Sequence, residues 1–280
     1  MIQRLAIVGV GLLGGSIALA ARAQGLAREI VGIGRDRARL EAPLRAGAVD
    51  RVTTDLADGV GDADLVVLAA TVLANERLLA EAWTAVAPTA VITDVGSTKR
   101  GIVAAAERLP GATAFVGSHP MAGSEKSGYA VARADLYRGA TVIVTPTESS
   151  QPRAVKTVTT FWEALGARVG LLDPETHDRV VAAISHVPHV AAWALVDTVA
   201  RFEPAALSFA ARGFKDTTRI AGADPAMWTE ILLGNRDTVV AGLAAFRTAL
   251  DELERLIAAG DRGGIEALLA RLKREREALG

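Results

Sequence analysis

The sequence contains no cysteine, which excludes disulfide bridges, thiolate metal sites and a cysteine nucleophile. This composition suits a reducing compartment, and we expect the protein to be cytoplasmic. The chain also lacks an excess of either charge, because its formal net charge at pH 7 is -1 and acidic and basic residues are mixed along it. No overall field would hold nucleic acid or an anionic membrane, so we expect neither as a partner.

An uninterrupted apolar run is also missing near the N-terminus. The stretch LAIVGVGLLGGSIALAARA is apolar, but glycines between Gly9 and Gly15 and the serine at 16 interrupt it, and the only basic residue that precedes it is Arg4. We therefore interpret it as part of a folded core, not as a signal peptide or a membrane span.

A length of 280 residues, half of them hydrophobic, is compatible with two domains. Short apolar segments alternate with longer helical ones up to about residue 173, which is typical of a Rossmann-type parallel sheet wound with helices. From about Thr176 no strand is apparent, and helix-length segments follow. We predict an α/β domain over residues 1–173 and an all-helical domain over 174–280. The predicted strands are LAIVGV, EIVGIG, DLVVLAA, AVITDVG, TAFVGSH, ATVIVTP and ARVGLLD.

Two features of the helical part can be located from sequence. Asp224 and Pro225 are suited to the cap and first turn of a helix. Further on, apolar residues recur at alternating spacings of four and three from Val239 to Ile257, which is the pattern of a coiled-coil seam. Such a helix packs on its own domain or pairs with a second subunit. We expect a homodimer through this seam.

A glycine-rich turn predicts a dinucleotide site. Gly9, Gly11 and Gly14 form GxGxxG between the first predicted strand and a helical segment, and Leu12 and Leu13 complete the turn. Glycines here permit a tight turn and close approach of the backbone to a pyrophosphate at the helix N-terminus. We therefore expect the domain over residues 1–173 to bind NAD(P), and the helical domain over 174–280 to serve substrate binding and dimerisation.

The end of the second predicted strand bears on the choice of cofactor. An acidic residue there would bind the ribose 2′-hydroxyl of NAD, but the sequence has Gly34 followed by Arg35. A guanidinium can bind a 2′-phosphate, so the sequence favours NADP over NAD. Asp36 leaves NAD open, because a shift of one residue would bring its carboxylate to the ribose.

Two polar residues are expected beside the cofactor. Ser97 follows the strand AVITDVG, and His119, in GSHPMAGSEKSG, follows AFVGS. Ligands of open α/β sheets bind outside the carboxyl ends of the strands. Ser97 and His119 are therefore candidates for the reacting centre.

The helical part supplies further candidates. His186 and His189 lie three residues apart in ISHVPH, and Arg219 in GFKDTTRIA could bind a carboxylate. His177 stands alone before them. The alternatives are a metal site built from His119, His186 and His189, and an ordinary surface salt bridge for Arg219.

Taken together, GVGLLGGS, DVGSTK, GSHPMAGSEKSG, ISHVPH, GFKDTTRIA and DPAMW resemble the prephenate/arogenate dehydrogenase family of tyrosine biosynthesis. The resemblance covers nearly the whole chain in the family's order. It implies an oxidative decarboxylation, in which a 4-hydroxycyclohexadiene carboxylate gives a hydride to NAD(P)⁺ and loses carbon dioxide as its ring becomes aromatic. Prephenate and arogenate both remain possible substrates.

The resemblance also implies roles for individual residues. His119 would accept the proton of the ring hydroxyl, and Ser97 would hydrogen-bond to that hydroxyl or to the imidazole. Arg219 would bind a substrate carboxylate, with His189 near the side chain that distinguishes the two substrates. Further residues expected around the substrate are His186, Glu125, Asp216 and Trp228.

Two rival functions remain at this stage. A β-hydroxyacid dehydrogenase also joins a Rossmann domain to a helical one, but it relies on a lysine, for which Lys215 is the only candidate in GFKDTTRIA. A dinucleotide-sensing protein without turnover would keep the glycine loop and have no use for His119 and Arg219.

Overall fold

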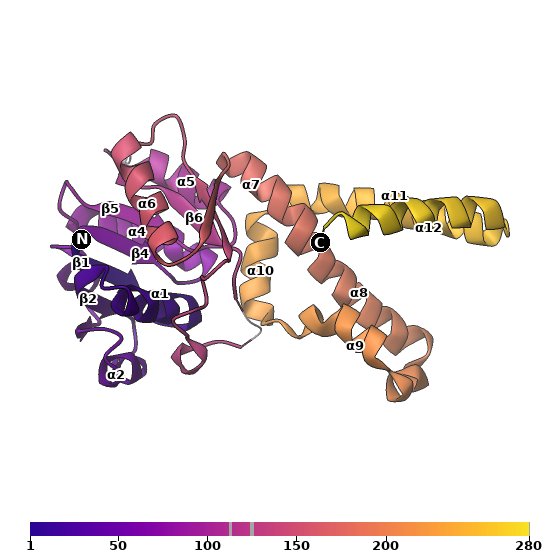
Figure 1. The fold of residues 1–280 in the computed structure, drawn as a ribbon, viewed down its shortest axis with the longest axis horizontal. Coiled ribbons are helices and arrows are strands. Elements are labelled where there is room, and N and C mark those ends of the chain that lie inside the picture. Colours follow the sequence, from indigo (N-terminus) through magenta and orange to yellow (C-terminus); the bar gives the residue numbers. More distant parts are fainter. Residues whose placement is uncertain (112–113, 124–125, 280) are drawn as a thin grey trace.

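The computed structural model describes residues 1–111, 114–123 and 126–279. A sheet covered by helices forms the first part of the molecule, and the second part consists of helices that project from it (Figure 1). The Rossmann-type fold followed by a helical domain is the predicted fold class.

The first sheet has five parallel strands in the order β3-β2-β1-β4-β5. Its central strands are buried on both faces, as their continuous apolar sequences predict. The short edge strand was not predicted, because it has three residues and only Val52 is buried. The strands are β1 (Ile2–Val8), β2 (Ala27–Ile33), β3 (Arg51–Thr53), β4 (Leu65–Leu68) and β5 (Val91–Asp94).

A second, three-stranded sheet continues beyond β5, to which Phe115 is joined by a bridge with Ile92. Its first strand runs antiparallel to the second, whereas the second and third are parallel. The antiparallel direction of β6 was not expected from the alternating pattern. These strands are β6 (Gly117–Pro120), β7 (Thr141–Thr145) and β8 (Arg168–Leu171).

Helices cover both faces of the sheet. Alternation along β1 directs Leu5 and Ile7 to a core shared with α1 and α6, and Ala6 and Val8 to a core shared with α3, α4 and α5. The helices of this part are α1 (Leu12–Ala23), α2 (Arg37–Arg45), α3 (Leu56–Val60), α4 (Val72–Ala85), α5 (Arg100–Glu107), α6 (Pro152–Ala164) and the 3₁₀ turn η2 (Tyr129–Val131).

The helical part begins immediately after β8. Asp173 caps the first helix by accepting a hydrogen bond from the Thr176 N–H at 2.9 Å. The predicted start at Asp224 and Pro225 is confirmed, since the Asp224 carboxylate accepts from the Met227 N–H at 2.8 Å. The elements are α7 (Pro174–Val181), η3 (Ala182–His186), α8 (Val187–Phe202), η4 (Pro204–Phe209), α9 (Arg212–Thr218), η5 (Arg219–Gly222), α10 (Pro225–Gly234), α11 (Arg236–Ala258) and α12 (Arg262–Glu277).

Pro188 lies inside a continuous helical run and does not end it. The segment η3, just before the proline, is a π-helical turn. A widened turn accommodates a residue that has no N–H to donate, and such turns are frequent at functional sites. His186 and His189 lie on either side of this junction.

Several apolar faces of the helical part are exposed. The helices α11 and α12 form an antiparallel pair that extends away from the sheet (Figure 1). Along the predicted seam of α11, Val239 is buried, but Phe246, Leu250 and Ile257 are exposed by 37%, 47% and 66%.

The run Pro174–Phe202 has the length and composition of a membrane span, with mean hydropathy 1.4 in its most apolar stretch. Its buried side chains include His177, Asp178 and His186. These residues hydrogen-bond to other parts of the protein, as described below, so we interpret the run as part of the folded domain.

Candidate active site

A cavity of about 470 Å³ lies between the sheet edge and the helical part. The loop after β5, the strand β6 and the helices η3, α8 and α10 all contribute to its walls. It brings together most of the polar residues predicted from sequence. The lining includes Ser97, His119, His186, His189, Arg219 and Trp228.

The glycine turn has the geometry that a dinucleotide requires. Gly9 has φ +100°, and a Cβ atom on it would lie 2.6 Å from the carbonyl oxygen of Ala69. A Cβ on Gly14 would lie 2.0 Å from the carbonyl oxygen of Gly9. Around Gly11, by contrast, the space is open to a distance of 4 Å. The turn is therefore tight at two glycines and accessible at the third, which fits a pyrophosphate that approaches the backbone.

The start of α1 is suited to an anion. Gly11 is its N-cap, no side chain caps the first turn and no acidic residue occurs there. The unpaired N–H groups of this turn, which begins at Leu12 and Leu13, carry partial positive charge. The residues present therefore fit the phosphates of NAD or NADP.

The residues after β2 have different environments. Asp36 caps α2, where its carboxylate accepts from the Ala38 N–H at 2.9 Å and lies 3.5 Å from the Arg39 guanidinium. The Asp36 carboxylate is thus engaged within its own helix. Arg35 is exposed, and Gly34 follows the strand directly.

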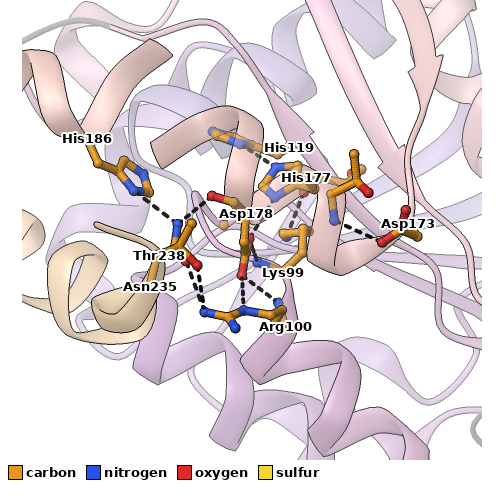
Figure 2. Close-up of polar contacts among 12 residues, drawn as sticks. Lys99, Arg100, His119, Asp173, His177, Asp178, His186, Asn235 and Thr238 are labelled. Atoms are coloured by element: carbon orange, nitrogen blue, oxygen red, sulfur yellow. Dashed lines mark hydrogen bonds and ion pairs between the residues drawn. The ribbon is translucent and has the colours of Figure 1, made fainter. Parts of the chain in front are cut away.

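His119 lies within β6, not after it, and pairs with Ile143 of β7. Its side chain borders the cavity but is only 8% exposed. Behind it, His119 Nδ1 lies 2.9 Å from Nε2 of the fully buried His177, and His177 Nδ1 lies 2.8 Å from Oδ1 of Asp178 (Figure 2). Neither His177 nor Asp178 was predicted to belong to the site.

The carboxylate of Asp178 is held by the loop after β5. It accepts hydrogen bonds from the backbone N–H groups of Lys99, at 2.8 Å, and Arg100, at 3.1 Å. The Arg100 Nε also lies 3.3 Å from it. Because Asp178 is on α7, these contacts attach the helical part to the sheet edge.

Lys99 and Asn235 are also buried, and together with His177 and Asp178 they form a buried polar layer behind the cavity. The Lys99 ammonium contacts the Asp94 carboxylate and donates to the Ser118 carbonyl at 2.9 Å. Asn235 Nδ2 donates to the main-chain oxygen of Asp178 at 2.7 Å and lies 3.3 Å from Nδ1 of His186 (Figure 2).

Burial keeps the histidines of the site neutral. It lowers the pKa of His119 well below the usual value, and interactions with His177 and Lys99 act in the same direction. Burial also lowers the pKa of His186 to about 4, against the opposing effect of the Asp178 carboxylate. The imidazole of His119 can therefore accept a proton at neutral pH.

The far wall of the cavity combines aromatic and charged groups. The His189 ring stacks on Trp228 with centroids 3.7 Å apart, and its Nδ1 lies 2.9 Å from the Ser185 carbonyl oxygen. Arg219, at the end of α9, contributes a positive charge to the same wall. A cavity with a neutral base on one side and a guanidinium on the other suits an anionic substrate.

Other predicted residues lie elsewhere. Asp216 is on the exposed side of α9, where it pairs with Arg212 at 3.2 Å, and it is not part of the cavity lining. Lys215, the lysine that the β-hydroxyacid alternative requires, is exposed on the same helix and also outside the lining. Glu125 lies outside the described residues. Within the described chain, no cluster of three histidine or carboxylate side chains is arranged to hold a metal ion.

Sequence reasoning missed the layer formed by Lys99, His177, Asp178 and Asn235. The only local signal is the adjacent pair His177 and Asp178 in DPETHD, since a histidine next to a carboxylate is a common buried arrangement. Lys99 and Asn235 carry no signal, because lysine and asparagine are ordinarily exposed.

Two family models match this chain. The nucleotide-binding domain of prephenate dehydrogenase matches residues 17–171, and its dimerization domain matches residues 173–273. The prephenate dehydrogenase of Bacillus subtilis is 39% identical over 245 residues, which are 86% of this chain and 66% of that protein.

Solved structures agree over the whole chain. The prephenate dehydrogenase of Aquifex aeolicus, solved with hydroxyphenyl propionate and NAD⁺, has a TM-score of 0.94 and 34% identity, covering 100% of this chain and 99% of that one. The arogenate dehydrogenase of Synechocystis has a TM-score of 0.84 and 28% identity, covering 99% of this chain and 100% of that one.

Proposed function

This chain belongs to the prephenate dehydrogenase family, and we propose that it catalyses the oxidative decarboxylation of prephenate or arogenate with NADP⁺ or NAD⁺. As a member of this family it is an NAD(P)-dependent oxidoreductase of tyrosine biosynthesis. The observation that carries the substrate class is the cavity itself. There a neutral imidazole, a guanidinium and an aromatic wall converge where β5 ends, at the same edge of the parallel sheet as the glycine turn after β1.

His119 is the proposed base. When bound, NAD(P)⁺ accepts the hydride from the ring carbon that carries the hydroxyl. His119 takes the hydroxyl proton as the carbon–oxygen double bond forms. Loss of carbon dioxide then leaves its electron pair in the ring, which becomes aromatic, and the imidazolium returns the proton to the phenolic oxygen.

The other cavity residues orient the substrate. Ser97 hydrogen-bonds to the ring hydroxyl or to the imidazole of His119, and Arg219 binds a substrate carboxylate. His186 and His189 lie on the wall toward the substrate side chain, with Trp228 packed between them. Glu125 and Asp216 are proposed only as residues of the site entrance.

NADP⁺ is the proposed preferred cofactor. Arg35 is exposed beside the end of β2 and can bind a 2′-phosphate, whereas the Asp36 carboxylate is engaged at the cap of α2. A carboxylate held by its own helix is less available to a ribose hydroxyl. The glycine turn binds the phosphates common to both cofactors.

The protein is further proposed to be a cytoplasmic homodimer. The dimerization-domain match and the exposed apolar residues of α11 support a subunit interface in the helical part.

One assay with four combinations tests the activity. Prephenate and arogenate are each supplied with NAD⁺ and with NADP⁺, and reduced nicotinamide is followed by absorbance. We expect absorbance to rise with at least one substrate, and no rise in any combination would refute the proposed function. NADP⁺ should be used at least as well as NAD⁺. A preference for NAD⁺ of about tenfold or more in kcat/KM would contradict the role of Arg35.

The variant Arg35→Ala refines this test. It should lower kcat/KM with NADP⁺ and leave the value with NAD⁺ nearly unchanged, because only NADP⁺ carries the 2′-phosphate. Arg45→Ala, at the other end of α2, is the matched control. Equal losses with both cofactors in Arg35→Ala would mean that the side chain does not recognise the phosphate.

A further inference from the structure

Two histidines of the cavity rest on a common buried layer that the proposed chemistry does not use directly. Of the four residues of this layer, His177, Asp178 and Asn235 determine the contacts of the two rings, and each is fully buried. The layer contacts His119 on one side and His186 on the other (Figure 2). Each contact determines which ring nitrogen carries the proton.

The first branch starts at the Asp178 carboxylate. Burial raises the pKa of Asp178, but hydrogen bonds from His177 and from the N–H groups of Lys99 and Arg100 outweigh this and lower it overall. An ionised carboxylate can only accept hydrogen bonds. At 2.8 Å from Asp178 Oδ1, Nδ1 of His177 must therefore carry a proton. Since burial also lowers the pKa of His177, its ring is neutral and its Nε2 holds a lone pair.

That lone pair determines the state of His119. Nε2 of His177 lies 2.9 Å from Nδ1 of His119, so His119 Nδ1 must be the donor. In a neutral ring, Nε2 of His119 is then unprotonated. This atom makes no hydrogen bond with a described residue, and the ring borders the cavity.

The second branch passes through Asn235. Its Oδ1 receives a hydrogen bond from Arg100 at 3.2 Å, and its Nδ2 donates to the main-chain oxygen of Asp178 at 2.7 Å. A guanidinium cannot accept and a carbonyl cannot donate, so the orientation of the amide is fixed from both ends. Nδ2 is therefore also the donor toward Nδ1 of His186, which leaves the proton of His186 on Nε2.

We propose that this buried layer is a positioning device that holds the two cavity histidines in opposite tautomers, His119 as a hydrogen-bond acceptor and His186 as a donor. The proposal rests on the proposed function in one respect, namely that His119 is the base. An imidazole without a fixed partner exchanges between two tautomers, and only one of them can accept the hydroxyl proton at Nε2. Asp178 takes part in both branches through its side chain and its main-chain oxygen. It therefore acts as a positioning residue without contacting the substrate.

The charged groups packed around this layer are those already described. Lys99 contacts Asp94 and donates to the carbonyl of Ser118, the residue before His119. Arg100 contacts both Asp178 and Asn235. The charge of Arg219 acts on His189. His189 itself donates from Nδ1 to the Ser185 carbonyl, which cannot donate in return. The layer and this contact predict the tautomers of all four histidines.

Nitrogen NMR of the whole protein, labelled with ¹⁵N only in histidine, measures these tautomers directly. At pH 8 we expect Nδ1–H tautomers for His119, His177 and His189 and an Nε2–H tautomer for His186. Single replacements of His186 and His189 assign the signals. A wild-type spectrum with Nε2–H at His119, or with Nδ1–H at His186, would overturn the proposal. No substrate is present, so this result is independent of whether His119 acts as a base.

Two variants of His177 separate positioning from mere packing. Glutamine reaches about as far as Nε2 of His177 and offers an oxygen to His119, whereas leucine offers none. His177→Gln should keep the His119 tautomer and most of the turnover. His177→Leu should give mixed tautomers and lower kcat at least about tenfold, with KM nearly unchanged. Equal losses in both variants, or wild-type turnover in His177→Leu, would indicate packing alone. If His177→Leu does not fold, the wild-type spectrum and His177→Gln still decide the matter.

Discussion

Burial dominates the chemistry of individual residues in the site. The pKa values of His119, His177, His186 and His189 are all lowered, and desolvation is the largest cause for each. A histidine with a pKa well below 7 is unprotonated at neutral pH and so is able to take up a proton, although it is a weaker base than an exposed imidazole. The site is therefore prepared to remove a proton at neutral pH.

Replacing His119 with asparagine should abolish that function. Asparagine keeps a polar group of similar reach but cannot take a proton, so turnover should fall by roughly 10² to 10⁴. Cofactor affinity should change little, because the glycine turn lies at the end of a different strand. In the wild type, activity should be lost only as pH falls below about 6.5, through the lowered pKa of His119. Stopped-flow turnover across pH measures both effects. Near-normal turnover in the variant, or the same loss of its residual activity as pH falls, would mean that the proton leaves by another route.

The role of Arg219 is tested by its removal. In Arg219→Ala a substrate carboxylate loses its partner, which costs on the order of 2 to 5 kcal/mol and should appear mainly as a higher KM. Steady-state kinetics with the preferred substrate measure this. Arg271→Ala, on the surface of α12, is the control. If KM is the same in Arg219→Ala as in the wild type, the guanidinium belongs to an ordinary surface salt bridge.

At the scale of elements, the helix α11 carries apolar side chains that no other described part of its own domain covers. The seam predicted from sequence is exposed at Phe246, Leu250 and Ile257, whereas α12 packs against another side of the helix near Leu256. Exposed apolar residues in line along one helix indicate a surface that a second copy can bury.

A charge on this seam should therefore dissociate the dimer. In Leu250→Asp, sedimentation should show a monomer at micromolar concentration where the wild type is dimeric, because an unpaired carboxylate would be buried at the interface. Thr248→Asp places the same charge on the opposite face of α11 and should remain dimeric. A monomeric wild type, or a dimeric Leu250→Asp, would place the interface elsewhere.

For the molecule as a whole, the polar layer connects the two parts of the fold. Lys99 and Arg100 belong to the sheet edge, whereas Asp178, Asn235 and Thr238 belong to the helices. The groups proposed to position His119 are the same groups that hold the helical part in place. We therefore expect stability and activity to depend on the same buried layer, including the histidines that it contacts.

Stability should consequently fall in acid. A histidine with a lowered folded-state pKa binds fewer protons when folded, so its contribution is complete above pH 6.5 and is lost as pH falls toward its folded value. For His186, with a pKa of about 4, the full loss is on the order of 3 kcal/mol. Denaturant unfolding at pH 7.5, 6 and 5 measures the decline. His186→Gln should reduce the slope of this decline, and an identical slope would show that His186 titrates normally.

Much of the fold is encoded locally. The glycine turn after β1, the change to helices after Asp173 and the start of α10 at Asp224 each follow from a few neighbouring residues. These patterns were predictable because backbone conformation and burial impose short periods and specific cap residues on the sequence. The strand β3 was missed because an edge strand of three residues has too little apolar pattern.

The candidate site likewise contains residues that local sequence motifs predict and residues that only the tertiary structure brings together. The sequence alone made His119, His189 and Arg219 candidates, since each lies in a short motif whose family resemblance is specific, and all three line the cavity. Only the tertiary structure placed His177 against His119, 58 residues away, and Asn235 against Asp178, 57 residues away. Contacts over such separations depend on how β6, α7 and α11 pack, and no local period records them. The same packing decided the buried contacts of the His119 and His186 rings. Residue types therefore determined which chemistry is available, and packing decided which atoms can perform it.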